Sequence, residues 1–306
     1  MKSMLLKKIC LPVLASTLLL ACERDYDITV KDGQQQLIVE GYINNEFPLY
    51  NYVVLSRSKD FYDPGLENLA VSGATVSITE GERVSGDIQW DEATRTVLTE
   101  GRLPQLANSA LPGFYFDQRL RYDSLNALVG KPGKCYKLTI EVEGKQYSAI
   151  TQLPVPVAID TLTCGFYYTD SNADTTYSKA RITVNYKDPD TIGNTQLFFW
   201  RHWDNRKSFG WGALGTNRFA SGADDLVNGQ QIAFTQSYGF VLGDSVSIYM
   251  ASVERPVYNF WDSFNKARSN DGPFATPVTL QSTIQGELVT GCFSGFSVSV
   301  KSVVVQ

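Results

Sequence analysis

Residues 135–151 read CYKLTIEVEGKQYSAIT and contain the two clearest predicted strands of the chain. Apolar and polar side chains alternate along residues 135–142, and this period of two is typical of a half-buried strand. Four apolar side chains would share one face: Tyr136, Leu138, Ile140 and Val142. The turn Glu143-Gly144-Lys145 follows, so the chain is expected to fold back into a partner strand.

Other short strand-like runs surround these two strands. Three of them are rich in strand-forming residues and bounded by turn residues: residues 37–44, 51–58 and 73–79. Residues 87–100 predict a hairpin that turns near Asp91–Thr94. Because many short strands at regular spacing are typical of a sandwich, we expect residues 37–152 to form an N-terminal transthyretin-like or immunoglobulin-like β-sandwich.

A proline-rich segment follows this region. Residues 153–160 read LPVPVAID, and the two prolines stiffen the chain as an extended connector. We therefore place a domain boundary there and expect a second β-sandwich over residues 161–306. Its predicted strands cover residues 161–168, 180–186, 195–203, 244–253, 279–284 and 295–305.

Residues 256–267 carry the one convincing helical pattern. Pro256 falls in the first turn, where a missing N–H is tolerated. Apolar side chains recur at helical spacing: Val257, Phe260, Trp261 and Phe264. We expect this aromatic face to pack in a core or between the domains, with a binding stripe as the alternative. The predicted fold is thus mostly β, with two sandwiches and one helix.

The first 22 residues have the layout of a lipoprotein signal. A basic region contains Lys2, Lys7 and Lys8. The apolar run that follows, residues 9–20, is too short to span a bilayer as a permanent helix. Residues 19–22 read LLAC, a lipobox that presents the Cys22 thiol for a diacylglyceryl group. An ordinary secretory signal with an incidental cysteine, or a buried apolar helix, is the alternative.

Cleavage before Cys22 would remove residues 1–21 and leave residues 22–36 as a lipidated, flexible tether. Two or three acyl chains, palmitate among them, give stable membrane anchoring. The acidic residues Glu23, Asp25 and Asp27 resemble the export signals that carry lipoproteins of Bacteroidota to the outer face of the outer membrane. A solvated acidic linker is the alternative. We expect a protein anchored in the cell outer membrane and facing the exterior.

The composition is that of a globular protein, with 43% hydrophobic and 19% charged residues. Its formal net charge of −5 argues against nucleic acid or anionic lipid headgroups as partners. No apolar segment after Cys22 is long enough to cross a membrane as a helix.

Three cysteines remain once the signal and the anchor are set aside: Cys135, Cys164 and Cys292. Their number is odd, so at most one disulfide can form within the chain, and Cys164 with Cys292 is the pairing considered. Three buried free thiols are the slightly favoured alternative. Their spacing does not resemble a set of metal ligands.

The densest candidate binding segment reads WRHWDNRKSFGWG, residues 200–212. Its site residues are Trp200, Arg201, Trp203, Asp204, Arg206 and Trp211. Flat aromatic faces beside polar groups suit stacking on a sugar or aromatic ligand. Trp and Arg also dominate protein interfaces, so docking on a protein is the stronger functional hypothesis. The plain alternative is that Trp200 and His202 continue a strand and Trp203 packs on the core.

Catalytic motifs are missing from the sequence. It contains no G-x-S-x-G elbow, H-E-x-x-H pair, P-loop or dinucleotide fingerprint, and it has a single histidine, His202. Asp188-Pro189-Asp190 is more typical of a turn than of a calcium loop. We predict no catalytic residue, no metal site and no cofactor, although the paired carboxylates of a glycosidase would leave no local signature.

Several segments in order resemble a known family: residues 37–43 (LIVEGYI), 71–78 (VSGATVSI), 133–151, 185–190 (NYKDPD), the helix with Tyr258 and Trp261, and 283–294 (TIQGELVTGCFS). These residues are similar to the Bacteroidota outer-membrane lipoproteins catalogued as a domain of unknown function and often encoded beside TonB-dependent receptors. The resemblance implies a surface lipoprotein associated with such a transporter, and it transfers no catalytic residue. Glu287, Leu288 and Val289 depart from the more glycine-rich closing segment of the relatives.

We therefore expect a non-enzymatic, lipid-anchored accessory protein that docks on a TonB-dependent outer-membrane β-barrel and serves nutrient capture, gating or complex assembly. A freestanding surface lipoprotein that binds a glycan or small molecule through the Trp203–Trp211 loop is the alternative. A hydrolase is the least favoured class.

Overall fold

The computed structural model describes residues 34–59, 65, 68–101, 111–172, 175–202, 220–223, 228–270, 276 and 278–306. Residues 35–306 form one compact unit. The predicted signal peptide, the lipidation site Cys22 and most of the predicted tether lie outside the described residues. These expectations therefore stay predictions.

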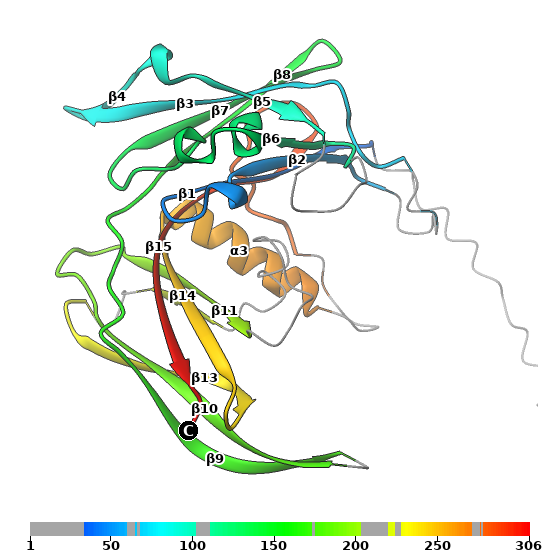
Figure 1. Cartoon of the computed structure of the whole chain (residues 1–306). Coiled ribbons are helices and arrows are strands. Elements are labelled where there is room, and N and C mark those ends of the chain that lie inside the picture. Colours follow the sequence, from blue (N-terminus) through cyan, green and yellow to red (C-terminus); the bar gives the residue numbers. More distant parts are fainter. Residues whose placement is uncertain are drawn as a thin grey trace, which may run out of the picture. The chain divides into compact units, whose positions relative to one another are not determined.

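The described residues are mostly β-strand, as the sequence predicts (Figure 1). The first half contains β1 (Leu37–Asn44), β2 (Tyr52–Arg57), β3 (Thr75–Val84), β4 (Asp87–Trp90), β5 (Thr96–Glu100), β6 (Phe114–Phe116), β7 (Cys135–Val142) and β8 (Lys145–Gln152). The second half contains β9 (Thr161–Asn172), β10 (Thr175–Lys187), β11 (Thr195–His202), β12 (Ala220–Ala223), β13 (Gln231–Val241), β14 (Ser245–Val253) and β15 (Val289–Val304). Short 3-10 turns cover Pro48–Tyr50, Glu92–Thr94, Gln118–Arg121 and Ser124–Asn126.

The helix α3 (Arg255–Arg268) confirms the helix predicted over residues 256–267. Pro256 occupies its first turn, as expected, and Lys266 and Arg268 lie in the last turn, where cations favour the negative end of the helix dipole. Within the described ranges, no helix is both long enough and apolar enough to span a membrane.

Most strands join a large mixed sheet in the order β12-β11-β14-β15-β1-β2-β6-β5-β3-β7-β8, with β4 added to β3. β15 pairs antiparallel with β14 and parallel with β1. The parallel register runs from Leu37 opposite Val289 to Asn44 opposite Phe296. β15 therefore links strands of the first half of the chain to strands of the second half in one sheet, while residues 153–160 connect β8 to β9 without forming a helix or strand.

The hairpin β7–β8 is confirmed, with Val142 opposite Lys145. Its two turn residues, Glu143 and Gly144, have φ angles of 51° and 73°. Positive φ at both central positions defines the tight turn that matches the twist of the flanking strands, and glycine adopts it without strain.

The hairpin predicted over residues 87–100 is wrong. β4 and β5 both pair with β3, one after the other, and these two described strands do not pair with each other. The residues between them stay bound to β3, because the Asp91 N–H donates to the Glu80 carbonyl at 2.9 Å and the Glu80 N–H donates to Thr94 Oγ1 at 3.0 Å. Turn residues in the sequence mark this break but do not show which strand lies opposite.

The strand predicted over residues 279–284 is also absent from the structure, which shows no regular element at 278–284. This segment contacts β15 through separate hydrogen bonds. The Thr283 N–H donates to the Gly291 carbonyl at 3.1 Å, and the Ser282 hydroxyl donates to the same carbonyl at 3.0 Å. A side-chain donor thus occupies an acceptor that a regular ladder would use.

Two apolar cores give the fold its sandwich character. In the first, Val39 and Val53 of β1 and β2 pack with Leu138 of β7. In the second, side chains of the three-stranded sheet β13-β10-β9, such as Ile182, pack with Ile248 and others of the large sheet. The first core thus lies between strands of one large sheet, whereas the second buries faces of two sheets against each other, the defining feature of a β-sandwich.

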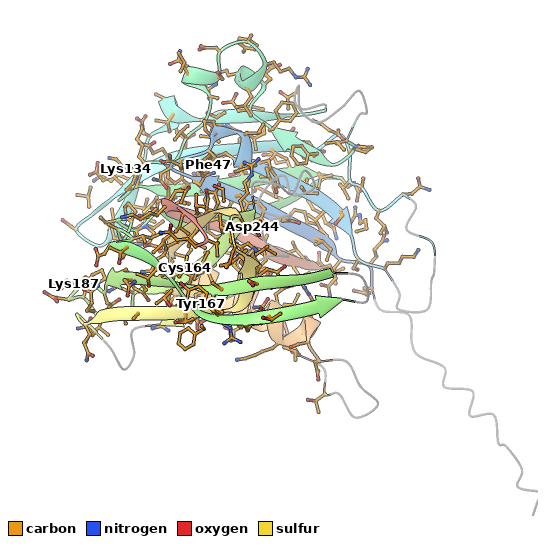
Figure 2. All side chains as sticks on the ribbon, turned by 60° about the horizontal axis from the view of Figure 1, so that its bottom comes forward. Phe47, Lys134, Cys164, Tyr167, Lys187 and Asp244 are labelled. Atoms are coloured by element: carbon orange, nitrogen blue, oxygen red, sulfur yellow. The ribbon has the colours of Figure 1, made fainter. Side chains whose placement is uncertain are left out.

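Cys135, Cys164 and Cys292 are free thiols, so the pairing of Cys164 with Cys292 is not formed. Cys135 and Cys292 are buried, and Cys164 is half-buried on β9 (Figure 2). Burial raises the pKa of the Cys292 thiol to about 11. This thiol is therefore protonated at neutral pH and behaves as an apolar side chain.

Candidate functional site

The predicted binding segment at residues 200–212 is described only at its start. Trp200 lies in β11, where its ring stacks on Tyr238 with centroids 5.8 Å apart and planes at 21°. It also meets Phe240 edge-on at 6.2 Å. Trp200 thus continues a strand, as the plain alternative expected, and it also packs against the second core.

The other site residues of that segment fall into two groups. Arg201, in β11, is half-buried beside Tyr249, where its positive charge opposes the rise in the Tyr249 pKa that burial causes. Trp203, Asp204, Arg206 and Trp211 lie outside the described residues. The binding role of this segment stays a prediction.

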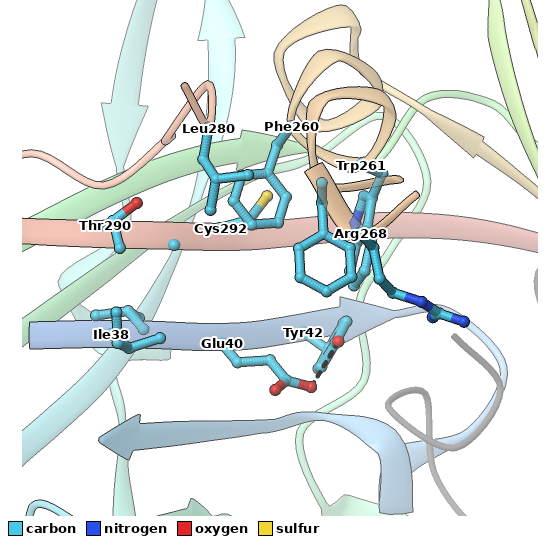
Figure 3. A pocket seen from close by; sticks show the side chains of 12 residues that line it. Ile38, Glu40, Tyr42, Phe260, Trp261, Arg268, Leu280, Thr290 and Cys292 are labelled. Atoms are coloured by element: carbon cyan, nitrogen blue, oxygen red, sulfur yellow. Dashed lines mark hydrogen bonds between the residues drawn. The ribbon is translucent and has the colours of Figure 1, made fainter. Parts of the chain in front are cut away.

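A cavity of about 250 Å³ lies between α3 and the parallel strands β1 and β15 (Figure 3). Alternate residues of the two strands form its floor: Ile38, Glu40 and Tyr42 from β1, and Thr290 and Cys292 from β15. The helix contributes Phe260, Trp261, Phe264 and Arg268, and Leu280 adds a further apolar side chain. The lining is therefore mostly aromatic and aliphatic.

The sequence of β1 explains why one face of the strand lines the pocket while its other face packs in a core. Its residues Val39 and Ile43 belong to the first core, while Tyr42 belongs to a separate cluster with the aromatic side chains of α3. A strand with both faces covered reads as a nearly continuous apolar run. Glu40 is the one charged residue in this strand, and it lines the pocket.

Tyr42 contacts the aromatic side chains on one side of the cavity, which we call the aromatic wall. Its ring is 1% exposed, stacks on Trp261 at 6.3 Å and meets Tyr52 edge-on at 5.2 Å. Its hydroxyl donates to Glu40 Oε1 at 2.7 Å, which Figure 3 marks with a dashed line. Burial, with a smaller contribution from the Glu40 charge, raises the pKa of Tyr42 well above its ordinary value. Tyr42 therefore stays a neutral donor at neutral pH.

The polar atoms behind this wall are satisfied internally. Trp261 Nε1 donates to Ser294 Oγ at 3.1 Å, and Ser294 Oγ donates to Cys292 Sγ at 3.2 Å. These bonds hold the Trp261 ring against β15. They also leave the Trp261 N–H unavailable to a ligand.

Two charged groups border the cavity. Glu40 is half-buried, and no bond to its second carboxylate oxygen is made by any residue that the structure describes. Arg268, the last residue of α3, is exposed and forms no ion pair with a described carboxylate. The site thus combines an apolar interior with one negative and one positive group.

Sequence reasoning did not select this pocket, although it noted the aromatic side chains of the helix. The available signals were Glu40 within an apolar strand and the stripe Phe260, Trp261 and Phe264. The stripe was expected to pack in a core. It does so in part, because Phe260 is 7% exposed, and it also lines the cavity.

Potential metal ligands do not cluster in the part of the chain that the structure describes. The described residues contain no group of three or more His, Cys, Asp or Glu side chains placed to hold an ion. Asp188, 3% exposed, accepts a hydrogen bond from the Gly229 N–H at 3.1 Å through Oδ2. The Asp188–Asp190 segment is bound there to the turn that precedes β13.

Comparison with known proteins relates most of the chain to one family. Residues 23–302 match the family described as "Domain of unknown function (DUF4249)". No curated protein matches the chain.

Proposed function

We propose, since the chain belongs to the DUF4249 family, that it is a non-enzymatic, lipid-anchored outer-membrane protein that partners a TonB-dependent transporter. The lipobox at residues 19–22 carries this proposal, because a basic region, a short apolar run, a small residue and a cysteine follow in order. The family match begins at residue 23, directly after Cys22, and so agrees with an anchor that precedes the shared domain.

Two observations support a TonB-dependent transporter as the partner. The sequence resembles lipoproteins that are often encoded beside TonB-dependent receptors, in segments that lie between residues 37 and 294. The segment from Trp200 to Gly212 offers Trp and Arg side chains of the kind that dominate protein interfaces. In the complex, the protein would serve nutrient capture, gating or assembly of the transporter.

The experiment is a gentle detergent pull-down of the tagged full chain from native outer membranes, with mass spectrometry of the recovered proteins. We expect a TonB-dependent receptor in stoichiometric amount. Trp203→Ala with Trp211→Ala should remove the receptor from the recovered complex, whereas Trp90→Ala, in the first half of the chain, should leave it bound. Recovery of the protein alone, under conditions that preserve other complexes, would overturn the partnership.

The anchor is tested in the same preparations. Cys22→Ser should abolish acylation, read from the intact mass, and move the protein out of the membrane fraction. Cys164→Ser is the matched control, because Cys164 is a half-buried free thiol in β9. Retention of Cys22→Ser in the membrane with its acyl mass intact would contradict the lipobox.

A freestanding ligand-binding surface lipoprotein is the second candidate. The cavity of about 250 Å³ beside α3 favours it, because concave, mostly apolar sites with a few polar groups are typical binding pockets. Such a protein would show saturable affinity for a polysaccharide or small molecule without any barrel. For a polysaccharide, the Trp203–Trp211 loop would be the binding segment.

A further inference from the structure

We propose that the cavity beside α3 binds a small zwitterion with an apolar body, namely a free amino acid with an aromatic or branched aliphatic side chain. The ammonium group would pair with Glu40, the carboxylate would pair with Arg268, and the side chain would enter the aromatic interior. This inference does not depend on the lipid anchor or on the transporter.

The size and lining of the cavity select the ligand's body. A volume of about 250 Å³ falls just below the range of roughly 300–1,000 Å³ that drug-sized ligands occupy. The cavity therefore suits a single amino acid better than an oligosaccharide. Phe260, Phe264 and Leu280 present aromatic and aliphatic surface to its interior, and burial of an apolar side chain there removes it from water.

Glu40 selects the ammonium group. Its Oε1 accepts the Tyr42 hydroxyl, and a carboxylate has room for further donors at its second oxygen. A closely bound ligand would remove water from this half-buried charge, and a buried charge without a partner is costly. A cationic group on the ligand would supply the missing partner.

Arg268 selects the carboxylate. A guanidinium presents its N–H donors in a planar fork that matches a carboxylate in two-point contact. In Figure 3, the labelled Arg268 and Glu40 side chains lie on the side of the drawn pocket away from Leu280. Among the described residues, no ion pair joins Arg268 to Glu40, and both side chains line the cavity.

Only a zwitterion satisfies both groups. A simple amine would bring a positive charge toward Arg268, and a simple carboxylic acid would bring a negative charge toward Glu40. A like charge disfavours the charged form of each ligand at these positions. The two charges therefore discriminate against ligands that carry one of the two groups alone.

The test is a calorimetric titration of the purified full-length protein with four probes: L-phenylalanine, 2-phenylethylamine, 3-phenylpropionate and glycine. We expect saturable 1:1 binding of L-phenylalanine. Each probe with a single charge should bind about tenfold more weakly or worse, because a hydrogen-bonded charged contact is lost. Glycine should also bind at least about tenfold more weakly, because it buries no side chain.

Two variants assign the contacts. Glu40→Gln should remove the preference for L-phenylalanine over 3-phenylpropionate, while its amide oxygen still accepts the Tyr42 hydroxyl and so preserves the fold. Arg268→Gln should remove the preference over 2-phenylethylamine. Lys266→Gln is the control, because Lys266 pairs with Asp262 on the helix and does not line the cavity.

Three results would overturn the proposal. The first is absence of binding by L-phenylalanine. The second is equal affinity for L-phenylalanine and either singly charged probe, which would show an apolar pocket without charge selection. The third is unchanged selectivity in both Glu40→Gln and Arg268→Gln, with thermal unfolding like that of the wild type.

Discussion

The buried phenol of Tyr186 makes the free energy of unfolding depend on pH in the alkaline range. Tyr186 lies in β10, is 5% exposed and packs on Phe198 with ring centroids 5.9 Å apart. Burial, with a smaller contribution from the Asp188 charge, raises the pKa of Tyr186 to about 12. An unfolded chain releases this proton near its ordinary pKa of about 10, so the folded chain binds more protons above that pH. The contribution of Tyr186 to stability is therefore fully present below about pH 10 and is lost as the pH rises toward 12.

We expect Tyr186→Phe to flatten this fall. Denaturant unfolding from about pH 8 to about pH 12 should show a slope reduced by up to about 1.4 kcal/mol per pH unit, the contribution of one proton. Part of the pH dependence will remain, because burial also raises the pKa of Cys292 to about 11. Tyr122→Phe is the control, since Tyr122 is 73% exposed. A wild-type slope in Tyr186→Phe would contradict the assignment.

The pocket contains residues that could be predicted from the sequence and residues that could not. The charge of Glu40 inside LIVEGYI is visible without a structure. Its neighbours Trp261 and Arg268 are not predictable from that pattern, because they come from a helix far along the chain. The place of Trp200 in a strand was predicted as an alternative, whereas its stacking on Tyr238 was not.

Among the elements, local pairings were predictable and distant ones were not. The β7–β8 hairpin follows from alternation and a two-residue turn, both contained in residues 135–151. The parallel pairing of β1 with β15 has no such local signal, because the strands lie near opposite ends of the domain. The pairing of both β4 and β5 with β3 was not predicted for the same reason, since turn residues do not indicate which strand the next one pairs with.

Gly291 allows the close approach of β15 to β1. Its φ is 137°, and an added Cβ would collide with the backbone oxygen of Val39. Gly291→Ala should therefore strain the pairing and lower the free energy of unfolding by about 3 kcal/mol or more. Chemical denaturation measures this change.

Gly165→Ala is the matched control for this prediction. Gly165 is also a strand glycine, but an added Cβ would meet nothing within 4 Å. We expect a small change there, within about 0.5 kcal/mol, or a slight stabilisation from reduced freedom of the unfolded chain. Equal losses at the two positions would show that the contact with Val39 is not the cause.

For the whole molecule, β15 decides whether the two halves unfold together. It pairs with β1 of the first half and with β14 of the second half, so loss of either set of contacts leaves this long strand partly unpaired. We therefore expect residues 35–306 to unfold as one cooperative unit. A boundary at residues 153–160, as the prolines predict, would instead allow each half to open separately.

Ile182→Ala separates these two outcomes. Ile182 is fully buried in the second core, and its truncation should cost about 2–5 kcal/mol. In a cooperative unit, the slowest-exchanging amides of β7, in the first half, must lose the same protection free energy as those of β10. Hydrogen exchange with mass spectrometry measures both, and Ile192→Ala is the control, since Ile192 is 85% exposed. Loss of protection in β10 with β7 unchanged would show that β15 does not couple the halves, and the proline segment would then mark a true domain boundary.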